Sequence, residues 1–120
     1  MKNLLDWLPF GKVAELSSYE LLMLIEKDNA QMIDVRTEAE WRSSRIKGAI
    51  NLPITRFSKA HIKSLKLDPN KPLITICLSA HRSIPAVRQL KQMGLHQTTQ
   101  LKGGMNSWWR EGHPVVKGQS

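Results

Sequence analysis

Apolar residues along the chain follow two spacings, which together predict short strands alternating with helices. The segment from Leu73 to Ile76 is β-branched and does not alternate with polar residues, which is typical of a strand covered on both faces of a parallel sheet. After Ser83, apolar residues recur at every third position up to Met93, and Gly94 follows, so a helix is expected there. Further strands are predicted at residues 13–16, 32–35, 49–52 and 98–101.

Capping residues predict where two more helices begin. Ser17 with Glu20, and Thr37 with Glu40, have the spacing of a capping box, which pairs N–H groups that a helix start leaves unpaired. These helices are expected to extend to about residues 27 and 43. Two others are predicted at residues 57–65 and 105–111.

This order of elements predicts the fold class and the domain boundaries. Strands that alternate with helices favour an α/β fold, here a central, mainly parallel five-stranded sheet with helices on both faces. A chain of 120 residues is long enough for one such domain and too short for two. We assign the domain to residues 13–116, an apolar N-terminal extension to residues 1–12 and a tail to residues 117–120.

Composition and charge narrow the classes of partner. The net charge is +8, which suits anionic small molecules or acidic surfaces, but the basic residues form no run with interleaved aromatics, so nucleic-acid binding is not expected. The four histidines are scattered and the chain has one cysteine, so neither a metal site nor a disulfide is expected. No other cofactor is expected either.

The N-terminal segment MKNLLDWLPFGK has an apolar stretch interrupted by Asp6 and Pro9. It lacks a small-residue cleavage site and is too short to span a bilayer, so we expect no secretory signal and favour the cytoplasm. Residues 4–10 are expected to pack on the domain rather than to contact a membrane or a partner.

The chemistry-bearing segment is LITICLSAHRS, which places Cys77 at the end of a predicted buried strand and Arg82 where the next helix begins. N–H groups of such a strand-to-helix loop, and of a helix start, favour a thiolate over a thiol. Ligands of open α/β sheets bind at the carboxyl ends of strands, so we interpret Cys77 as a nucleophile. The alternative is an inert, buried cysteine that serves as a small apolar side chain.

Three segments together resemble the rhodanese-like (sulfurtransferase) family. They are IDVRTEAEWRSSRIKGAINLP, the loop CLSAHRS, and LKGGMNSWWREGHPV with its paired glycines and final Gly-x-Pro. The resemblance covers residues 13–116 and implies the rhodanese-like fold. It also implies transfer of a sulfane sulfur from thiosulfate or a protein persulfide to cyanide or a thiol, through a persulfide on Cys77.

The resemblance gives each loop residue an expected role. The N–H groups of the four-residue spacer and of Arg82 would cradle the anionic sulfur; the spacer residues are Leu78, Ser79, Ala80 and His81. Arg82 would attract an anionic donor, anchor the loop by pairing with a carboxylate, or do both. The His81 side chain either adds positive charge near the sulfur when protonated or faces solvent.

Residues outside the loop are expected to support it. Asp34 and Arg36 resemble a structural ion pair beside the site. Gly103 and Gly104 are expected to let the last loop approach the site, whereas Met105 and Trp108 are expected to be core residues.

Two departures from the family pattern stand out. Ser44 and Arg45 replace a Gly-His pair, and Ala80 occupies a position that is often glycine. If that position needs a positive φ, alanine is strained there by about 1 kcal/mol.

Two alternative functions remain. A cysteine phosphatase or arsenate reductase is disfavoured, because related phosphatases place five residues between cysteine and arginine and this loop has four. A non-catalytic binding or sulfur-carrier module with the same fold is the other alternative. The donor is expected to be a small anion or a protein persulfide.

Overall fold

In a computed structural model of the protein, residues 13–118 are described, and they form an α/β fold around one parallel sheet. The sheet has five strands in the order β1-β5-β4-β2-β3, and every neighbouring pair is parallel. The strands are β1 (Glu15–Leu16), β2 (Gln31–Asp34), β3 (Ile50–Asn51), β4 (Leu73–Ile76) and β5 (Thr98–Leu101). The predicted fold class is therefore confirmed, with β4 at the centre.

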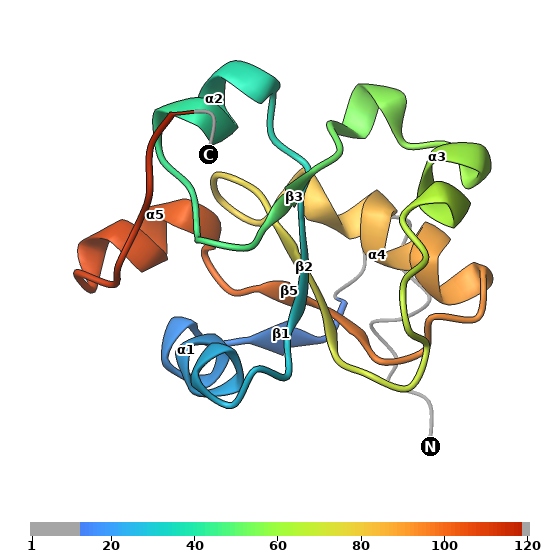
Figure 1. Ribbon diagram of the computed structural model, residues 1–120, viewed down its shortest axis with the longest axis horizontal. Helices are drawn as coiled ribbons and strands as arrows, with labels where there is room; N and C mark the ends of the chain where they lie inside the picture. The colour runs from blue at the N-terminus through green and yellow to red at the C-terminus, as the bar shows by residue number, and fades with distance from the viewer. Residues whose placement is uncertain (1–12, 119–120) are drawn as a thin grey trace.

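Helices cover both faces of the sheet, which Figure 1 shows nearly edge-on, with α1 and α5 on one side and α3 and α4 on the other. The helices are α1 (Ser18–Glu26), α2 (Glu38–Ser43), α3 (Lys59–Ser64), α4 (Ser83–Gln92) and α5 (Gly104–Arg110), with a 3₁₀ turn, η2 (Ile54–Arg56), before α3. The predicted capping boxes are present: Glu20 N–H donates to the Ser17 hydroxyl and Glu40 N–H to that of Thr37.

The two faces of the sheet carry separate apolar clusters. Successive side chains of β4 point to opposite faces, so Leu73 and Cys77 pack on the α3–α4 side, whereas Ile74 and Ile76 pack on the α1–α5 side. Met105 and Trp108 of α5 are buried in the second cluster, as predicted. Because β4 is buried on both faces, its loop is held rigidly at the base.

The predicted boundaries differ from the observed ones mainly at the sheet edges. Of residues 13–16, only β1 itself is strand, and β3 is likewise shorter than predicted, since each edge strand pairs with a single neighbour. The helix predicted at 57–65 begins only at Lys59, because η2 precedes it and the Ser58 side chain caps it. The expectations for residues 1–12 lie outside the described residues.

Within residues 13–118, no helix combines the length and the apolar character needed to cross a membrane.

Candidate active site

The loop from Cys77 to Arg82 connects β4 to α4 at the carboxyl end of the central strand. β2 flanks it on one side, because Asp34 pairs with Ile76 in register and Val35 N–H donates to the Ile76 carbonyl. Within the loop, Ala80 has a φ of 76°, the left-handed conformation that favours glycine. The loop therefore turns sharply around the position of Cys77, at the edge of the sheet where ligands of such folds bind.

The backbone N–H groups of this loop are unpaired. From Leu78 to Ser83, none donates a hydrogen bond to any carbonyl or side chain of residues 13–118, the Cys77 sulfur included. Successive N–H groups that alternate between right- and left-handed backbone form a concave site for an anion. Arg82 is right-handed and Ala80 left-handed, so this loop has both conformations.

Cys77 itself is almost completely buried. Its exposed fraction is 1%, and it belongs to the apolar cluster that includes Ala86 and Leu90 of α4. The Ser79 and His81 side chains are exposed, and the Ser79 hydroxyl lies 2.9 Å from His81 Nδ1. Of the two interpretations for His81, the structure favours the solvent-facing one.

The start of α5 holds the first residues of the loop. Met105 N–H donates to the Cys77 carbonyl at 2.8 Å and Asn106 N–H to the Leu78 carbonyl at 3.0 Å. This approach needs Gly104, because a Cβ there would lie 2.6 Å from the carbonyl carbon of Leu78 and would overlap the Cys77 carbonyl oxygen. Gly104, with Gly103 before it in left-handed backbone, thus lets the last loop approach the site, as predicted.

Arg82 forms a two-pronged ion pair with Glu40 of α2. Its Nη1 lies 2.8 Å from Oε1 and its Nη2 3.0 Å from Oε2. Hydrogen bonding from Arg82 lowers the pKa of Glu40 to about 2, and the same pairing raises the pKa of Arg82. The pair anchors the loop to α2 and offsets part of the positive charge that Arg82 would present to a donor.

Asp34 and Arg36 form the expected ion pair, buried, with 2.7 Å between Asp34 Oδ2 and Arg36 Nη2. Arg36 also donates to the Ser44 carbonyl, and the Asn51 amide donates to the carbonyls of both Asp34 and Arg36. These bonds join the end of β2 to the segment after α2 and to β3. Within the described residues, no hydrogen bond links the pair directly to residues 77–82.

Sequence reasoning missed three residues near the loop. Glu40 was predicted only as a capping residue, because the i+3 spacing that identifies a capping box says nothing about a contact with Arg82. The hydroxyls of Thr75 and Ser83 are fully buried and lack a hydrogen-bond partner. Thr75 lies on the same face of β4 as Cys77, and Ser83 begins α4, so both flank the cysteine; no sequence signal marks an unpaired hydroxyl.

The comparisons with known proteins agree with this geometry. The sequence model of the rhodanese-like domain matches residues 17–111. The chain belongs to the rhodanese-like family. The match includes β2, the cysteine loop and α5, which carry the site described above.

Individual relatives extend over most of the chain. A protein of Allochromatium vinosum named sulfurtransferase is 30% identical over 105 residues, covering 87% of this chain and 95% of its own. The uncharacterized protein YibN of Escherichia coli K12 is 29% identical over 109 residues, covering 91% and 76%. The crystal structure of a rhodanese-related protein from Thermoplasma volcanium superposes with a TM-score of 0.72 at 32% identity, covering 86% of this chain and 97% of that one. Rhodanese-like relatives thus include proteins named for sulfur transfer.

Proposed function

We propose that this rhodanese-like protein is a sulfurtransferase that carries a sulfane sulfur as a persulfide on Cys77. The observation that carries the proposal is the run of unpaired N–H groups from Leu78 to Ser83 beside that cysteine. Buried backbone N–H groups in native proteins are nearly always paired, and Ala80 and Ser83 are buried, so a run of six N–H groups without a protein acceptor fits a site for an anion. A thiolate and the persulfide formed from it supply such an anion.

The proposed reaction has two half-reactions. First, the Cys77 thiolate attacks the sulfane sulfur of thiosulfate; a new S–S bond forms, and the old S–S bond breaks with its electron pair leaving on sulfite. Second, an acceptor thiolate or cyanide attacks the outer sulfur, and the electron pair of the broken bond returns to Cys77. The loop N–H groups would stabilise the anionic sulfur in both states, as preorganised donors do in oxyanion sites.

Burial of Cys77 sets a condition on this cycle. With an exposed fraction of 1%, the sulfur must become accessible by a local opening of the loop before a donor or acceptor meets it. The anchors of the loop limit that opening: Glu40 holds Arg82 at one end, and Met105 and Asn106 hold the other.

Mass spectrometry of the intact chain after incubation with thiosulfate tests the proposal. Because the chain has one cysteine, an increase of one sulfur atom assigns the persulfide to Cys77, and it should be absent from Cys77→Ser. Cyanide should then remove the added sulfur and release thiocyanate. A chain that stays unmodified under excess thiosulfate and under excess protein persulfide contradicts the proposal.

A second candidate function is a binding module without turnover, and the burial of Cys77 favours it. Alkylation by iodoacetamide separates the two functions. A sulfurtransferase should be alkylated at neutral pH faster than the same chain unfolds, whereas a binding module should react only as fast as it unfolds. Hydrogen exchange under the same conditions gives the unfolding rate for comparison.

A further inference from the structure

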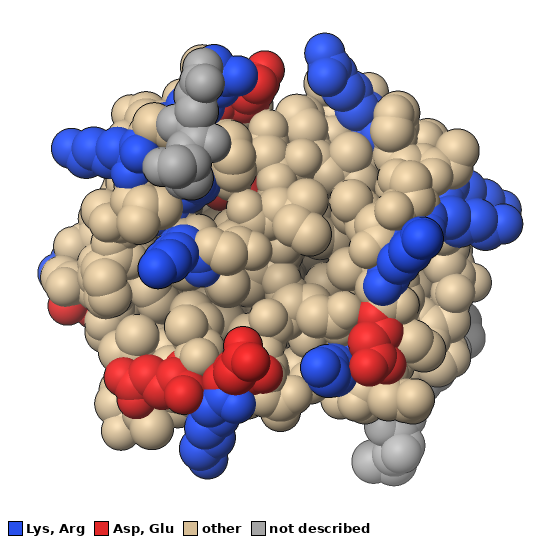
Figure 2. All heavy atoms as spheres, viewed as in Figure 1, with Lys and Arg blue, Asp and Glu red and all other residues tan. Residues whose placement is uncertain are grey.

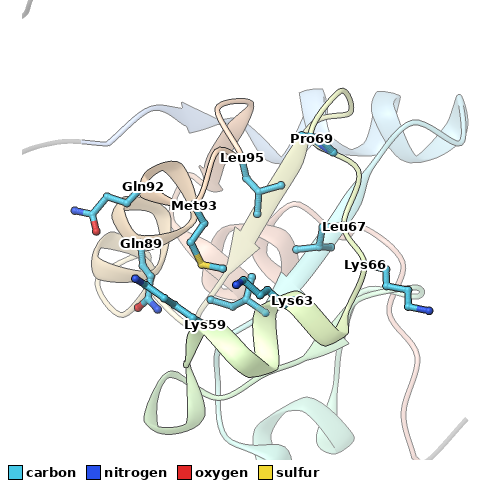
Figure 3. A pocket seen from close by; sticks show the side chains of 10 residues that line it. Lys59, Lys63, Lys66, Leu67, Pro69, Gln89, Gln92, Met93 and Leu95 are labelled. Carbon is cyan, nitrogen blue, oxygen red and sulfur yellow. The ribbon is translucent and has the colours of Figure 1, made fainter.

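A second feature of the molecule is a groove between α3 and α4, on the face of the sheet that holds Cys77. Its volume is about 520 Å³, and its floor is apolar. Figure 3 shows Leu67, Met93 and Leu95 pointing into the space between the two helices. A groove of this volume with an apolar floor is the size of a typical binding pocket.

The rim of this groove is positively charged. Lys59 and Lys63 stand one turn apart on α3, and Lys66 follows at its end, pointing away from the groove in Figure 3. None of the groove's lining residues is acidic, and no ion pair within residues 13–118 involves these lysines. Like charges at this spacing destabilise a helix slightly, so the pair stabilises the fold less than neutral residues would.

Basic side chains project from several sides of the molecule, including the side of the groove. Figure 2 shows them along the right-hand edge, where Figure 1 places α3 and α4, and also along the left-hand edge and at the top, with acidic side chains mainly in the lower part. One acidic residue, Asp68, lies in the sequence between the lining residues Leu67 and Pro69, and its carboxylate accepts a hydrogen bond from the Asn70 N–H.

The groove continues along α4 to the cysteine loop. An adjoining cavity of about 660 Å³ shares Lys59 with the groove and is lined by His81 and Ile84 at its other end. A third cavity, of about 390 Å³, shares His81 and Ile84 and reaches Ala80. These three cavities share lining residues and follow one another along α4, about 15 Å for its ten residues; together they are called the trough. The acidic residue among their lining residues is Glu15, in the third cavity.

We propose that this trough is the docking site for an acidic, amphipathic segment of a thiol protein that exchanges sulfur with Cys77. The inference rests on the proposed function and names its macromolecular partner. Acidic side chains of the segment would pair with Lys59 and Lys63, and its apolar side would contact the floor of the groove. The end of the segment would lie at His81, beside the loop.

Charge and shape together distinguish this occupant from two others. The chain's own residues 1–12 carry two basic side chains, Lys2 and Lys12, and one carboxylate, Asp6, so their charge matches the rim poorly. An anionic membrane surface matches the charge but is flat, whereas the apolar floor lies in a recess between two helices.

The transfer to this partner balances without any further reagent. The partner's thiolate attacks the outer sulfur of the Cys77 persulfide, a new S–S bond forms on the partner, and the Cys77–sulfur bond breaks. Its electron pair returns to Cys77 as a thiolate, and any proton on the outer sulfur moves with it. Docking in the trough would raise the effective concentration of the partner's thiol at the loop.

The experiment uses a synthetic amphipathic peptide with leucines on one face, glutamates on the other and a C-terminal cysteine. A matched peptide carries lysines in place of the glutamates. The full chain is loaded with thiosulfate and freed of donor, and the transfer of sulfur to each peptide is followed by mass spectrometry. We expect transfer to the acidic peptide to be about tenfold faster at low salt, since electrostatic steering raises association rates by that order or more.

Matched variants locate the effect. K59Q/K63Q should abolish the preference for the acidic peptide, whereas K27Q/K47Q, with the same change of charge on residues that line none of the three cavities, should retain it. Thiosulfate loading should be unchanged in both double variants. Equal rates for the two peptides, or an unaffected K59Q/K63Q variant, overturn the inference.

Two further measurements test the other two occupants, residues 1–12 and an anionic membrane surface. If deleting residues 1–12 accelerates transfer to both peptides equally, the trough belongs to the chain's own segment and the inference is wrong. It is also wrong if K59Q/K63Q loses binding to anionic vesicles but not to the acidic peptide. Peptide affinity, measured by fluorescence anisotropy on the chain without added sulfur, separates this inference from the proposed function. A chain that loads no sulfur but binds the acidic peptide more tightly contradicts the proposed function and leaves this inference standing.

Discussion

The carboxylate of Glu40 makes two contacts, one with the start of its own helix and one with the cysteine loop. Its Oε1 accepts the Thr37 N–H that completes the capping box of α2, and both its oxygens bind the guanidinium of Arg82. The start of α2 and the end of the cysteine loop are therefore joined through one side chain. A planar, two-pronged arginine–carboxylate pair fixes geometry better than a lysine would.

This pairing predicts a specific pH dependence of stability. Because the pKa of Glu40 falls from 4.5 to about 2 in the folded chain, its contribution is present above pH 4.5 and is lost as the pH falls toward 2. Glu40→Gln, which can keep the capping box, should flatten the decline of the urea midpoint over this range. Glu38→Gln, which removes a surface partner of Arg42, is the matched control and should retain the wild-type slope. The same slope in Glu40→Gln and wild type would contradict the prediction.

Ala80 is strained at the centre of the loop, with a φ of 76°. Ala80→Gly should therefore raise the free energy of unfolding by about 1 kcal/mol, because the gain from relieving a left-handed alanine exceeds the entropic cost of glycine. Ala86→Gly, in the regular part of α4, should lower it by at least about 1 kcal/mol. Urea denaturation measures both, and a destabilised Ala80→Gly would show that the strain is offset by contacts of the methyl group.

At the scale of elements, the start of α5 lies directly against the cysteine loop, through the hydrogen bonds of Met105 and Asn106 and the close approach of Gly104. Gly104→Ala would place a methyl group against the Cys77 and Leu78 carbonyls, so we expect a loss of about 3 kcal/mol of stability and slower loading of sulfur. Gly112→Ala is the control: its φ is +73° but nothing lies within 4 Å of the added Cβ, and the loss should be about 1 kcal/mol. Similar losses in the two variants, measured by thermal unfolding, would argue against the close approach.

The elements themselves were largely predictable from sequence because their signals are local. The capping boxes at Ser17 and Thr37, and the apolar run of β4, depend on residues a few positions apart. The contact between Glu40 and Arg82, 42 residues apart, has no local signal and required the fold. The unpaired hydroxyls of Thr75 and Ser83 were unpredictable for the same reason, since pairing depends on neighbours from other elements.

At the scale of the whole molecule, the C-terminal segment pairs with the end of α2 and the residues just after it. Arg45 pairs with Val116 through two backbone hydrogen bonds, and its guanidinium stacks on Trp41 at 4.1 Å and donates to the Gly118 carbonyl. Sequence reasoning recognised Arg45 as a departure from the family and assigned residue 118 to a tail. The buried position of Arg45 could not be read from its charge, because arginine is usually exposed.

Deleting residues 117–120 tests this contact. The deletion removes the bond from Arg45 to Gly118 and the bond from Gly118 N–H to the Arg42 carbonyl, so we expect a loss of about 2 kcal/mol and a fall in Tm of roughly 10 °C. Deletion of residues 119–120 alone leaves both bonds and is the control. An unchanged Tm after the longer deletion would show that water replaces both bonds at no cost.

The hydrogen bonds from Met105 and Asn106 to the carbonyls of Cys77 and Leu78 also set an order of events during synthesis. A nascent chain that has emerged from the ribosome only as far as β4 and α4 lacks the donors that fix the base of the loop. The loop that we propose to bind sulfur is therefore fixed at its base only after the last helix has formed, and until then the Cys77 thiol lacks the surroundings that bury it in the complete domain.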